Sequence, residues 1–321
     1  MSNHHHFDLH RVSEIYRTLP ARPEVVKPAL VLEGGGQRSI FSAGVVDAFM
    51  DHQFAPFVQV LGVSGGAHVG TTYAMDRKGM AKRIIEEVST NDRFYRRLNW
   101  FRSAPVMDLD WYFEVTQSHP AYRMDVSELA NTDMQLQLMA THADCFSPRR
   151  FHHDDHDLAL LLKASSAIPY FYDDGVEIHG HHFVDGGLGH PIPVREVVEQ
   201  GANYVVAIRV APKEREPDPI FSRGLHQFFK RTNANPRIGA MMDTHQANYQ
   251  RDEQYIKSPP PGVTTVQIAP HRALESVVLG STPEALIKDY KLGYETGVLF
   301  VNTWGAELVR GLGNPAQQSV A

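Results

Sequence analysis

Apolar residues along the chain follow two alternating patterns, one typical of buried strands and one typical of helices. Short, almost uninterrupted apolar runs indicate strands that are buried on both faces of a sheet, as in parallel sheets. Such runs occur at 28–33, 57–61, 204–208 and 263–268, whereas the run 135–140 alternates like a half-buried strand. The sequence therefore predicts a sheet built from these runs.

Helical spacing fills the intervals between the predicted strands. Phe41, Val45, Ala48 and Phe49 recur at i, i+4, i+7 and i+8 behind the first strand. Further helices are expected over 65–76, 79–89 and 158–166, from Pro193 to the residue before Gly201, and from Pro283 onward. Because strands alternate with helices, we expect an α/β fold, a three-layer α/β/α sandwich around a mostly parallel central sheet.

A Gly-x-Ser-x-Gly pentapeptide directly follows the second predicted strand. Ser64 is its serine, and Gly62 and Gly66 flank it. A strand that ends in a tight, glycine-flanked turn exposes the serine in a strained conformation, which suits a nucleophile. On its own the pentapeptide is equally compatible with an ordinary strand-to-helix turn.

Three consecutive glycines, Gly34, Gly35 and Gly36, lie between the first strand and the first helix, and Arg38 follows two residues later. Amides at a helix start have no helical acceptor and carry the positive end of the helix dipole. They can stabilise a bound phosphate or a developing oxyanion. A dinucleotide-binding loop is disfavoured, because Ser39 stands where that motif needs a glycine, and no P-loop lysine follows.

Asp185 ends a short apolar run and precedes two further glycines. An Asp-Gly pair is most often a turn. A serine nucleophile, however, needs a base, and an aspartate within hydrogen-bond reach can serve if burial raises its proton affinity. Asp185 is therefore the candidate base for Ser64. His182, three residues earlier, is a candidate third member of a triad.

These blocks together resemble the patatin-like phospholipase family, and especially its compact bacterial members. The resemblance rests on 34–38, 62–66 and 185–187, together with the intervening segment 164–169, Ala-Ser-Ser-Ala-Ile-Pro. The blocks stand in the family's order and cover about residues 28–210. The resemblance implies the patatin-like α/β/α fold.

The resemblance also implies a role for each site residue. Ser64 would be the nucleophile and Asp185 the general base and acid, without help from a histidine. The amides of residues 34–36 would form the oxyanion hole, and Arg38 would orient this loop or meet a lipid phosphate. The implied reaction is hydrolysis of phospholipid or lysophospholipid acyl esters through an acyl-enzyme, without a metal or organic cofactor.

Three other functions stay open at this stage. The same dyad would serve a carboxylesterase or an acyltransferase that uses smaller acyl donors. A non-catalytic lipid-binding protein can be built on the same fold, although the serine, the aspartate and the glycine loop are all present. A metal-dependent hydrolase is the third alternative, because histidines cluster at 152–157 and 179–182. Their spacing matches no defined zinc motif, so we expect no metal.

Composition and charge narrow the setting of the protein. The chain has 321 residues and a net charge of −6, which gives no electrostatic reason to expect nucleic-acid binding. Cys145 is the only cysteine, which suits a reducing compartment. No apolar run approaches the length of a membrane span. We therefore expect a cytoplasmic protein that contacts lipid peripherally, at an interface and without insertion.

The remaining expectations concern organisation. We expect an N-terminal extension at 1–27, a catalytic domain at 28–305 and a tail at 306–321. Within the domain, 28–210 would hold the motifs and 211–305 a C-terminal extension. Residues 91–124 mix aromatic and basic side chains, as a lid or headgroup interface would, but an amphipathic helix with solvated arginines is favoured. Residues 212–236 are expected as a surface excursion near the site. The oligomeric state is not predicted.

Overall fold

The computed structural model describes residues 3–11, 15, 20, 25–96, 99, 105–172, 175–212 and 236–312. Its strands are β1 (His4–Phe7), β2 (Pro28–Leu32), β3 (Gln59–Val63), β4 (Gln135–His142), β5 (Pro148–His152), β6 (Val176–Ile178), β7 (His181–Asp185), β8 (Tyr204–Ile208) and β9 (Thr264–Ile268). They form one sheet in the order β1-β9-β8-β2-β3-β4-β7-β6, with β5 also paired to β4. In this order, all strands from β1 through β9, β8, β2 and β3 to β4 are parallel to one another. By contrast, β5 and β7 run antiparallel to β4, and β6 runs antiparallel to β7. The mostly parallel central sheet is thus confirmed.

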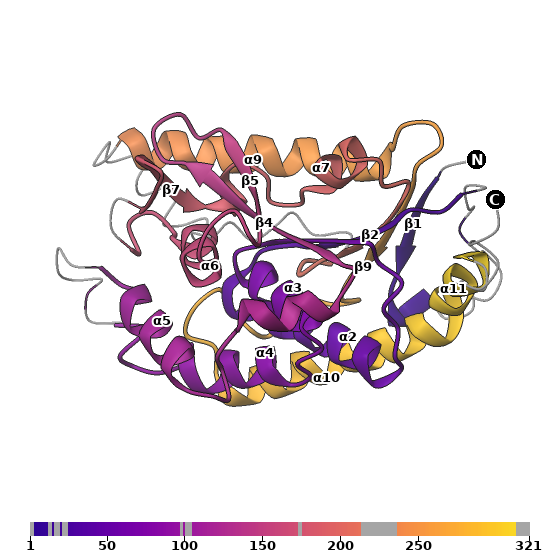
Figure 1. The fold of residues 1–321 in the computed structure, drawn as a ribbon, viewed down its shortest axis with the longest axis horizontal. Coiled ribbons are helices and arrows are strands. Elements are labelled where there is room, and N and C mark those ends of the chain that lie inside the picture. The colour runs from indigo at the N-terminus through magenta and orange to yellow at the C-terminus, as the bar shows by residue number, and fades with distance from the viewer. Residues whose placement is uncertain are drawn as a thin grey trace.

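Helices cover both faces of this sheet (Figure 1). They are α2 (Ile40–Asp51), α3 (Gly65–Ala74), α4 (Met80–Arg83), α5 (Leu109–Ser118), α6 (Leu158–Ser166), α7 (Val194–Glu199), α9 (Pro236–Lys257), α10 (Pro283–Phe300) and α11 (Ala306–Leu312). Shorter helical turns are η1 (Leu9–Arg11), η2 (Gly36–Ser39), η3 (Ile84–Val88), η5 (Val126–Asn131), η6 (Gly186–Leu188) and η7 (Val301–Gly305). In Figure 1, α7 and α9 lie above the sheet, and α2, α3, α4 and α10 lie below it. The three-layer α/β/α sandwich is confirmed.

Each central strand buries both of its faces, which explains its uninterrupted apolar sequence. In β2, Leu30 and Leu32 join the larger hydrophobic core, whereas Ala29 and Val31 join a second core on the other face. All four side chains are fully buried. The alternation follows from the period of two in a strand. The two cores hold the two helical layers against the sheet.

Several predicted boundaries are reproduced closely. The strand at 204–208 matches β8, and the helix from Pro283 matches α10. The Thr282 side chain caps α10 by accepting a hydrogen bond from the Ala285 amide. The strand predicted at 57–61 is shifted by two residues, to 59–63. It ends later than predicted because Gly62 and Val63 still belong to the ladder that joins β3 to β4.

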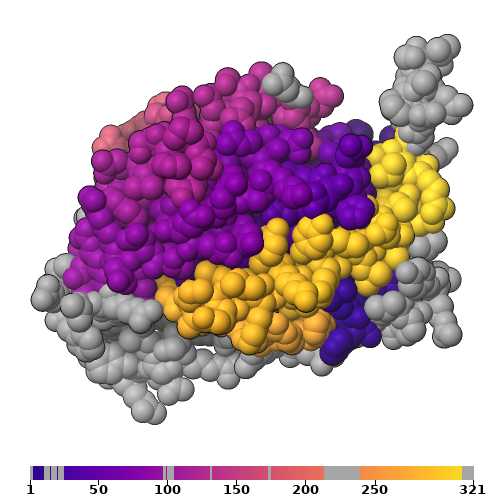
Figure 2. Space-filling model, turned by 90° about the horizontal axis from the view of Figure 1, so that it is seen from below, coloured from indigo at the N-terminus to yellow at the C-terminus, as the bar shows by residue number. Residues whose placement is uncertain are grey.

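The ends of the chain are more closely joined to the sheet than their sequence indicates. β1 lies inside the expected N-terminal extension, yet it pairs in parallel with β9 as an edge strand. The ring centroid of Phe300 in α10 lies 5.1 Å from that of Phe7 in β1 and 5.7 Å from that of Phe49 in α2. Figure 2 shows α10 and α11 crossing the lower helical face beside the N-terminal helices. α11 begins where the tail was expected to begin.

The register of three strands brings the two candidate catalytic residues to the same level. Val63 at the end of β3 pairs with Met139 of β4, so Ser64 follows level with Ala140. Ala140 in turn pairs with Asp185 at the end of β7. Because β5 occupies the opposite edge of β4 along 137–141, β7 continues along the same edge as β3. Ser64 and Asp185 therefore lie beside each other, where the ends of β3 and β7 meet.

Candidate active site

Ser64 forms the sharp turn between β3 and α3. Its backbone has φ 51° and ψ −126°, a conformation that a residue with a side chain adopts only when its surroundings impose it. The backbone amide of Ser64 donates a hydrogen bond of 2.9 Å to the Ser165 hydroxyl. This bond leaves the Ser64 side chain, 6 % exposed, free to face a cavity.

The flanking glycines permit this turn by close approach. A Cβ on Gly62 would lie 2.4 Å from the Cα of Ala67, and one on Gly66 would lie 2.5 Å from the Leu32 carbonyl oxygen. Neither backbone position can move without separating β2, β3 and α3. The strand, turn and helix that give the pentapeptide its meaning are therefore present.

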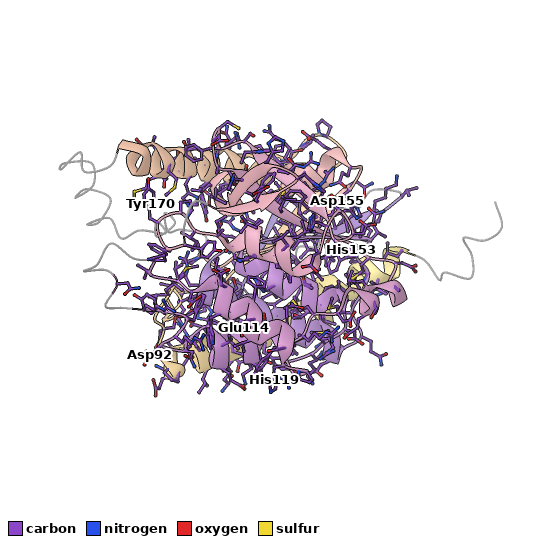
Figure 3. All side chains as sticks on the ribbon, turned by 60° about the vertical axis from the view of Figure 1, so that its left-hand side comes forward. Asp92, Glu114, His119, His153, Asp155 and Tyr170 are labelled. Atoms are coloured by element: carbon purple, nitrogen blue, oxygen red, sulfur yellow. The ribbon has the colours of Figure 1, made fainter. Side chains whose placement is uncertain are left out.

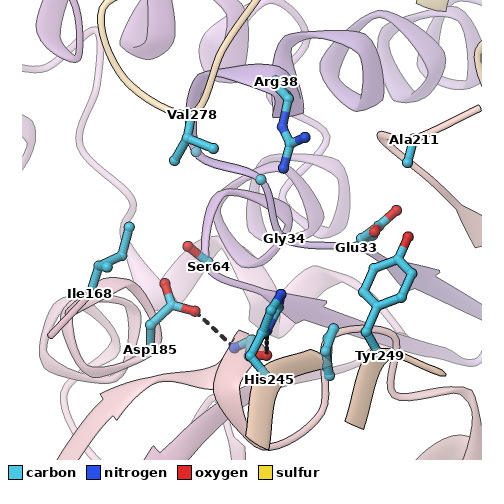
Figure 4. Close-up of a pocket in the computed structure, with 14 residues that line it drawn as sticks. Glu33, Gly34, Arg38, Ser64, Ile168, Asp185, Ala211, His245, Tyr249 and Val278 are labelled. Carbon is cyan, nitrogen blue, oxygen red and sulfur yellow. Dashed lines mark hydrogen bonds between the residues drawn. The ribbon is translucent and has the colours of Figure 1, made fainter. Parts of the chain in front are cut away.

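Asp185 faces Ser64 from the end of β7 (Figure 4). Its side chain is 3 % exposed, and its Oδ1 accepts a hydrogen bond of 2.8 Å from the Gly187 amide. Burial raises the pKa of Asp185 from its usual 3.8 to about 6, although hydrogen bonds from Ser64 and Gly187 offset part of the rise. A carboxyl with this pKa is ionised at neutral pH and is a much stronger base than an ordinary aspartate.

The 164–169 segment holds both residues in place. Ser165 accepts the hydrogen bond of the Ser64 amide, and the Ala167 carbonyl accepts one of 2.9 Å from the Asp185 amide. Ile168 lines the cavity between them. The 164–169 segment therefore fixes the distance between Ser64 and Asp185 by holding the backbone amides of both residues.

The glycine loop lies against the serine. A Cβ on Gly34 would be 3.3 Å from the Cβ of Ser64. Gly36 has φ +56°, and a Cβ there would lie 2.3 Å from the carbonyl oxygen of Val278. Within the described part of the chain, no protein group accepts a hydrogen bond from the amides of residues 34–36. These amides border the cavity that contains Ser64, where an oxyanion would form.

Gln37 anchors this loop from behind. Its amide donates to the Val278 carbonyl oxygen at 2.9 Å, its Oε1 accepts from the Ser281 amide at 2.8 Å, and its Nε2 donates to the Ser89 carbonyl oxygen at 2.8 Å. Arg38 extends on the other side, over the cavity (Figure 4). Its Nε is buried and has no hydrogen-bond partner among the described residues. The guanidinium therefore adds positive charge to the rim of the cavity.

Two cavities meet at Ser64. The cavity that we call polar holds the charged and hydrogen-bonding groups of Glu33, residues 34–36, Arg38, Asp185, His245 and Tyr249, and apolar side chains such as Ile168 and Val278 complete its wall. The apolar cavity is lined mainly by Val69, Ile84, Ile85, Phe94, Met107, Leu109, Tyr112 and Leu279. Ser64, Gly36 and Ile168 line both. An ester bound at the serine would therefore have a polar region on one side and an apolar region on the other.

His68 is one of the polar side chains that line the apolar cavity. Its Nε2 lies 3.2 Å from the Ser166 hydroxyl, and burial lowers the pKa of His68 to about 4. The ring is consequently neutral at physiological pH. It adds no charge to the wall of the cavity.

Other expected residues lie away from the dyad or outside the described ranges. His182 is exposed and sits three residues from Asp185 in β7, so it faces the opposite side of the strand and completes no triad. Donor atoms of His152, His153 and Asp154 lie within 4.8 Å of one another. In Figure 3 His153 is labelled just below Asp155; His153 is half-buried and Asp155 is exposed. Cys145 is exposed as well.

The aromatic and basic segment at 91–124 forms part of a cavity wall. Phe94 and Tyr112 are buried and line the apolar cavity, while Arg96 pairs with Asp108 at the surface. This is the favoured arrangement of aromatic residues in the core and solvated arginines. Arg97, Trp100, Phe101 and Arg102 lie outside the described residues, as does 213–235 within the expected surface excursion.

Pattern reasoning missed the contribution of α9. His245 and Tyr249 both line the polar cavity from this helix. His245 Nδ1 lies 2.7 Å from the Gly187 carbonyl oxygen, and burial lowers the pKa of His245. The spacing of Met241, Tyr249 and Ile256 behind Pro236 is compatible with a helix and could have indicated α9. The segment contains so many polar residues, however, that its apolar helical pattern is weak.

Residues 30–198 match the family model described as patatin-like phospholipase, and the chain belongs to this family. The enzyme is accordingly a lipid acyl-ester hydrolase. A second model, described as a domain of unknown function, DUF6363, matches residues 235–309.

The chain is similar to the following two relatives and one solved structure. The chain is 35% identical over 278 residues to the uncharacterized protein YjjU of Escherichia coli, covering 86% of this chain and 78% of YjjU. It is 30% identical over 242 residues to lysophospholipase NTE1 of Debaryomyces hansenii, covering 67% of this chain but only 14% of the yeast protein. The crystal structure of VipD from Legionella pneumophila is similar with a TM-score of 0.48 at 14% identity, covering 88% of this chain and 67% of VipD.

Among the described residues, no helix combines the length and the apolar character that a bilayer crossing requires.

Proposed function

We propose that the protein is a serine lipid acyl hydrolase that cleaves phospholipid or lysophospholipid acyl esters through a Ser64–Asp185 dyad. One observation carries the proposal: Ser64 faces a buried aspartate at the meeting point of an apolar and a polar cavity. A lipid ester has the same division, with an acyl chain on one side of the carbonyl and a glycerol headgroup on the other.

In the first half-reaction, ionised Asp185 takes the hydroxyl proton of Ser64 while Oγ attacks the ester carbonyl carbon. The carbonyl oxygen becomes an oxyanion, which the amides of residues 34–36 stabilise. One such preorganised donor contributes about 3–4 kcal/mol. Asp185 then gives the proton to the leaving alcohol oxygen, the C–O bond breaks, and the acyl group stays on Ser64.

In the second half-reaction, water attacks the acyl-enzyme. Asp185 takes a proton from the water as its oxygen adds to the carbonyl carbon, and the oxyanion forms again in the same loop. When the intermediate collapses, the proton passes to Ser64 Oγ, and the fatty acid leaves. The N-terminus of α3 begins beside the serine, so its dipole also favours negative charge there.

The surroundings of the dyad support a lipid substrate over a small ester. The apolar cavity offers the acyl chain a wall of aliphatic and aromatic side chains. Arg38 borders the polar cavity, where it would meet the phosphate of a headgroup. The lysophospholipase name of the yeast relatives agrees with this substrate class.

The test combines active-site labelling with hydrolysis of a lysophospholipid. A fluorophosphonate probe should label wild-type protein stoichiometrically at Ser64, as located by peptide mass spectrometry, and Ser64→Ala should remain unlabelled. Ser64→Ala should also lose hydrolysis by orders of magnitude while keeping its circular dichroism spectrum. A folded wild-type protein that takes no label would contradict the dyad. Labelling together with faster turnover of acetyl than of long-chain esters would favour a carboxylesterase.

A further inference from the structure

α9 belongs to the segment that matches a domain of unknown function, and one of its faces lies along the catalytic loop. His245, Asn248 and Asp252 are spaced by three and four residues, so they project from the same side of the helix. Opposite them lies the chain from Gly187 to Ile192, which directly follows the catalytic aspartate.

Each of these three side chains holds one part of that loop. His245 Nδ1 is 2.7 Å from the Gly187 carbonyl oxygen, and Asn248 Nδ2 donates to the Leu188 carbonyl oxygen at 2.6 Å. Asp252 accepts a hydrogen bond of 3.2 Å from the Ile192 amide. The helix therefore satisfies backbone groups that the sheet does not reach.

The contact at Gly187 matters most for chemistry. The amide of Gly187 donates to Asp185 Oδ1, while its carbonyl oxygen accepts from His245 (Figure 4, dashed lines). Gly187 lies in the short turn η6, and the contact to its carbonyl adds a second restraint on this turn. Because a glycine has no side chain to limit rotation about its backbone bonds, this restraint helps to hold the amide in the direction of the carboxylate.

The same face of α9 also reaches the glycine loop. Arg209 donates to the Tyr249 hydroxyl and, through Nε at 2.9 Å, to Glu33 Oε2. Glu33 also accepts a hydrogen bond of 2.8 Å from the Val210 amide. Because Glu33 immediately precedes Gly34, the helix is connected to both halves of the site.

We propose that the function of the C-terminal segment 235–309 is to complete the active site, with His245 acting as a positioning residue that fixes the Asp185 loop through the Gly187 carbonyl. The inference rests on the proposed Ser64–Asp185 chemistry. The inference assigns a role to a segment whose family model is described as a domain of unknown function.

The ring chemistry of His245 follows from its surroundings. A carbonyl oxygen only accepts hydrogen bonds, so Nδ1 must carry the proton. Arg38 and Glu33 face the ring from the glycine-loop side, and Asp252 faces it from its own helix. Burial outweighs these charges and keeps the ring neutral at physiological pH. The neutral Nδ1–H tautomer is the form that holds Gly187.

The two amide substitutions at this position separate the hydrogen bond from the volume of the ring. The amide nitrogen of Asn reaches about the position of Nδ1, whereas that of Gln reaches about the position of Nε2. His245→Asn should therefore retain the bond to Gly187, and His245→Gln and His245→Leu should lose it. Gln250→Leu, an exposed position of the same helix, serves as the matched control.

The four variants are compared with wild type in kcat, KM and the pH dependence of kcat on a lysophospholipid. We expect His245→Gln and His245→Leu to lower kcat about 100-fold, as a misplaced catalytic group does, with KM nearly unchanged. The acid limb of kcat, near pH 6 in wild type, should move to higher pH, because the Gly187 amide that lowers the pKa of Asp185 is no longer held against the carboxylate. His245→Asn should stay within a few-fold of wild type, and Gln250→Leu should match it.

Comparison of these variants decides the question. An unchanged kcat and acid limb in His245→Leu, or an Asn variant as impaired as the Gln variant, would overturn the positioning role. If His245→Leu does not fold, the comparison of Asn with Gln still decides, because both substitutions are polar and similar in size. Fluorophosphonate labelling of wild type distinguishes this failure from that of the dyad: a labelled, Ser64-dependent enzyme with unaffected His245 variants refutes only the inference.

Discussion

The buried carboxyl of Asp185 works against folding, and removing its charge should stabilise the protein while ending catalysis. Asp185→Asn keeps the shape of the side chain and its capacity to accept the Gly187 hydrogen bond. It cannot ionise, so it cannot accept the Ser64 proton. We expect kcat to fall by at least about 100-fold, the lower range for loss of a general base.

The expected gain in stability follows from the pKa. Each tenfold change in proton affinity corresponds to about 1.4 kcal/mol. Folding raises the pKa of Asp185 from 3.8 to about 6, so the ionised form costs the folded state about 3 kcal/mol at pH 8. The sign is opposite to that of a salt-bridged aspartate: the cost is absent below 3.8, grows as pH rises, and is complete above 6. At pH 4.5 only about 1 kcal/mol of it remains.

Urea denaturation followed by circular dichroism measures this difference at the two pH values. Asp185→Asn should exceed wild type by about 3 kcal/mol at pH 8 and by about 1 kcal/mol at pH 4.5. All other titrating groups are shared, so they cancel in the comparison. Ser64→Ala is the control, because it removes turnover but keeps an ionisable Asp185. Since it also removes a hydrogen bond that lowers the pKa of Asp185, its stability should fall with rising pH at least as steeply as that of wild type. An Asn variant no more stable at pH 8, or equally stabilised at both pH values, would refute the assignment of a raised pKa.

Two further substitutions test the cavities and the glycine loop. Ile85→Phe narrows the apolar cavity and should shift the preferred p-nitrophenyl ester to shorter acyl chains. Each methylene that the cavity excludes should lower kcat/KM about fourfold. An unchanged chain-length profile would mean that the acyl chain binds outside this cavity. Gly36→Ala places a Cβ on a residue with φ +56°, only 2.3 Å from the Val278 carbonyl oxygen. Both the rate of fluorophosphonate labelling and the thermal stability should therefore fall. A normal labelling rate would show that the glycine loop takes no part in the reaction.

The sequence predicted the central part of the fold because that part obeys simple periodicities. The strands β2 and β8 are short apolar runs, β4 alternates between polar and apolar residues, and the α10 helix begins with a threonine cap and a proline. The edge strands of the sheet were harder to predict from the sequence. β1 contains three histidines, and β5 is strongly polar, so neither has the pattern of a buried strand. Their pairing is decided by the exposed edges of β9 and β4, which a local pattern does not contain.

The candidate site divides in the same way. Ser64, Asp185 and the glycines stand in short motifs whose meaning is local, since each motif is a strand end and a turn. Their meeting depends on the registers of β3, β4 and β7, which the resemblance implied but no spacing along the chain reveals. His245 belongs to no motif. It reaches the site only because α9 crosses the sheet above the Asp185 loop.

The polarity of α9 and the demands of the site have one physical explanation. A strained serine, a buried carboxylate and unpaired loop amides are each unfavourable for folding, so the surrounding structure must hold them. A purely apolar helix could cover this end of the sheet, but it would leave the carbonyl oxygens of Gly187 and Leu188 without donors. His245 and Asn248 supply those donors, and Tyr249 meets the buried Arg209. The residues that make α9 useful to the site are the same ones that weaken its helical hydrophobic pattern.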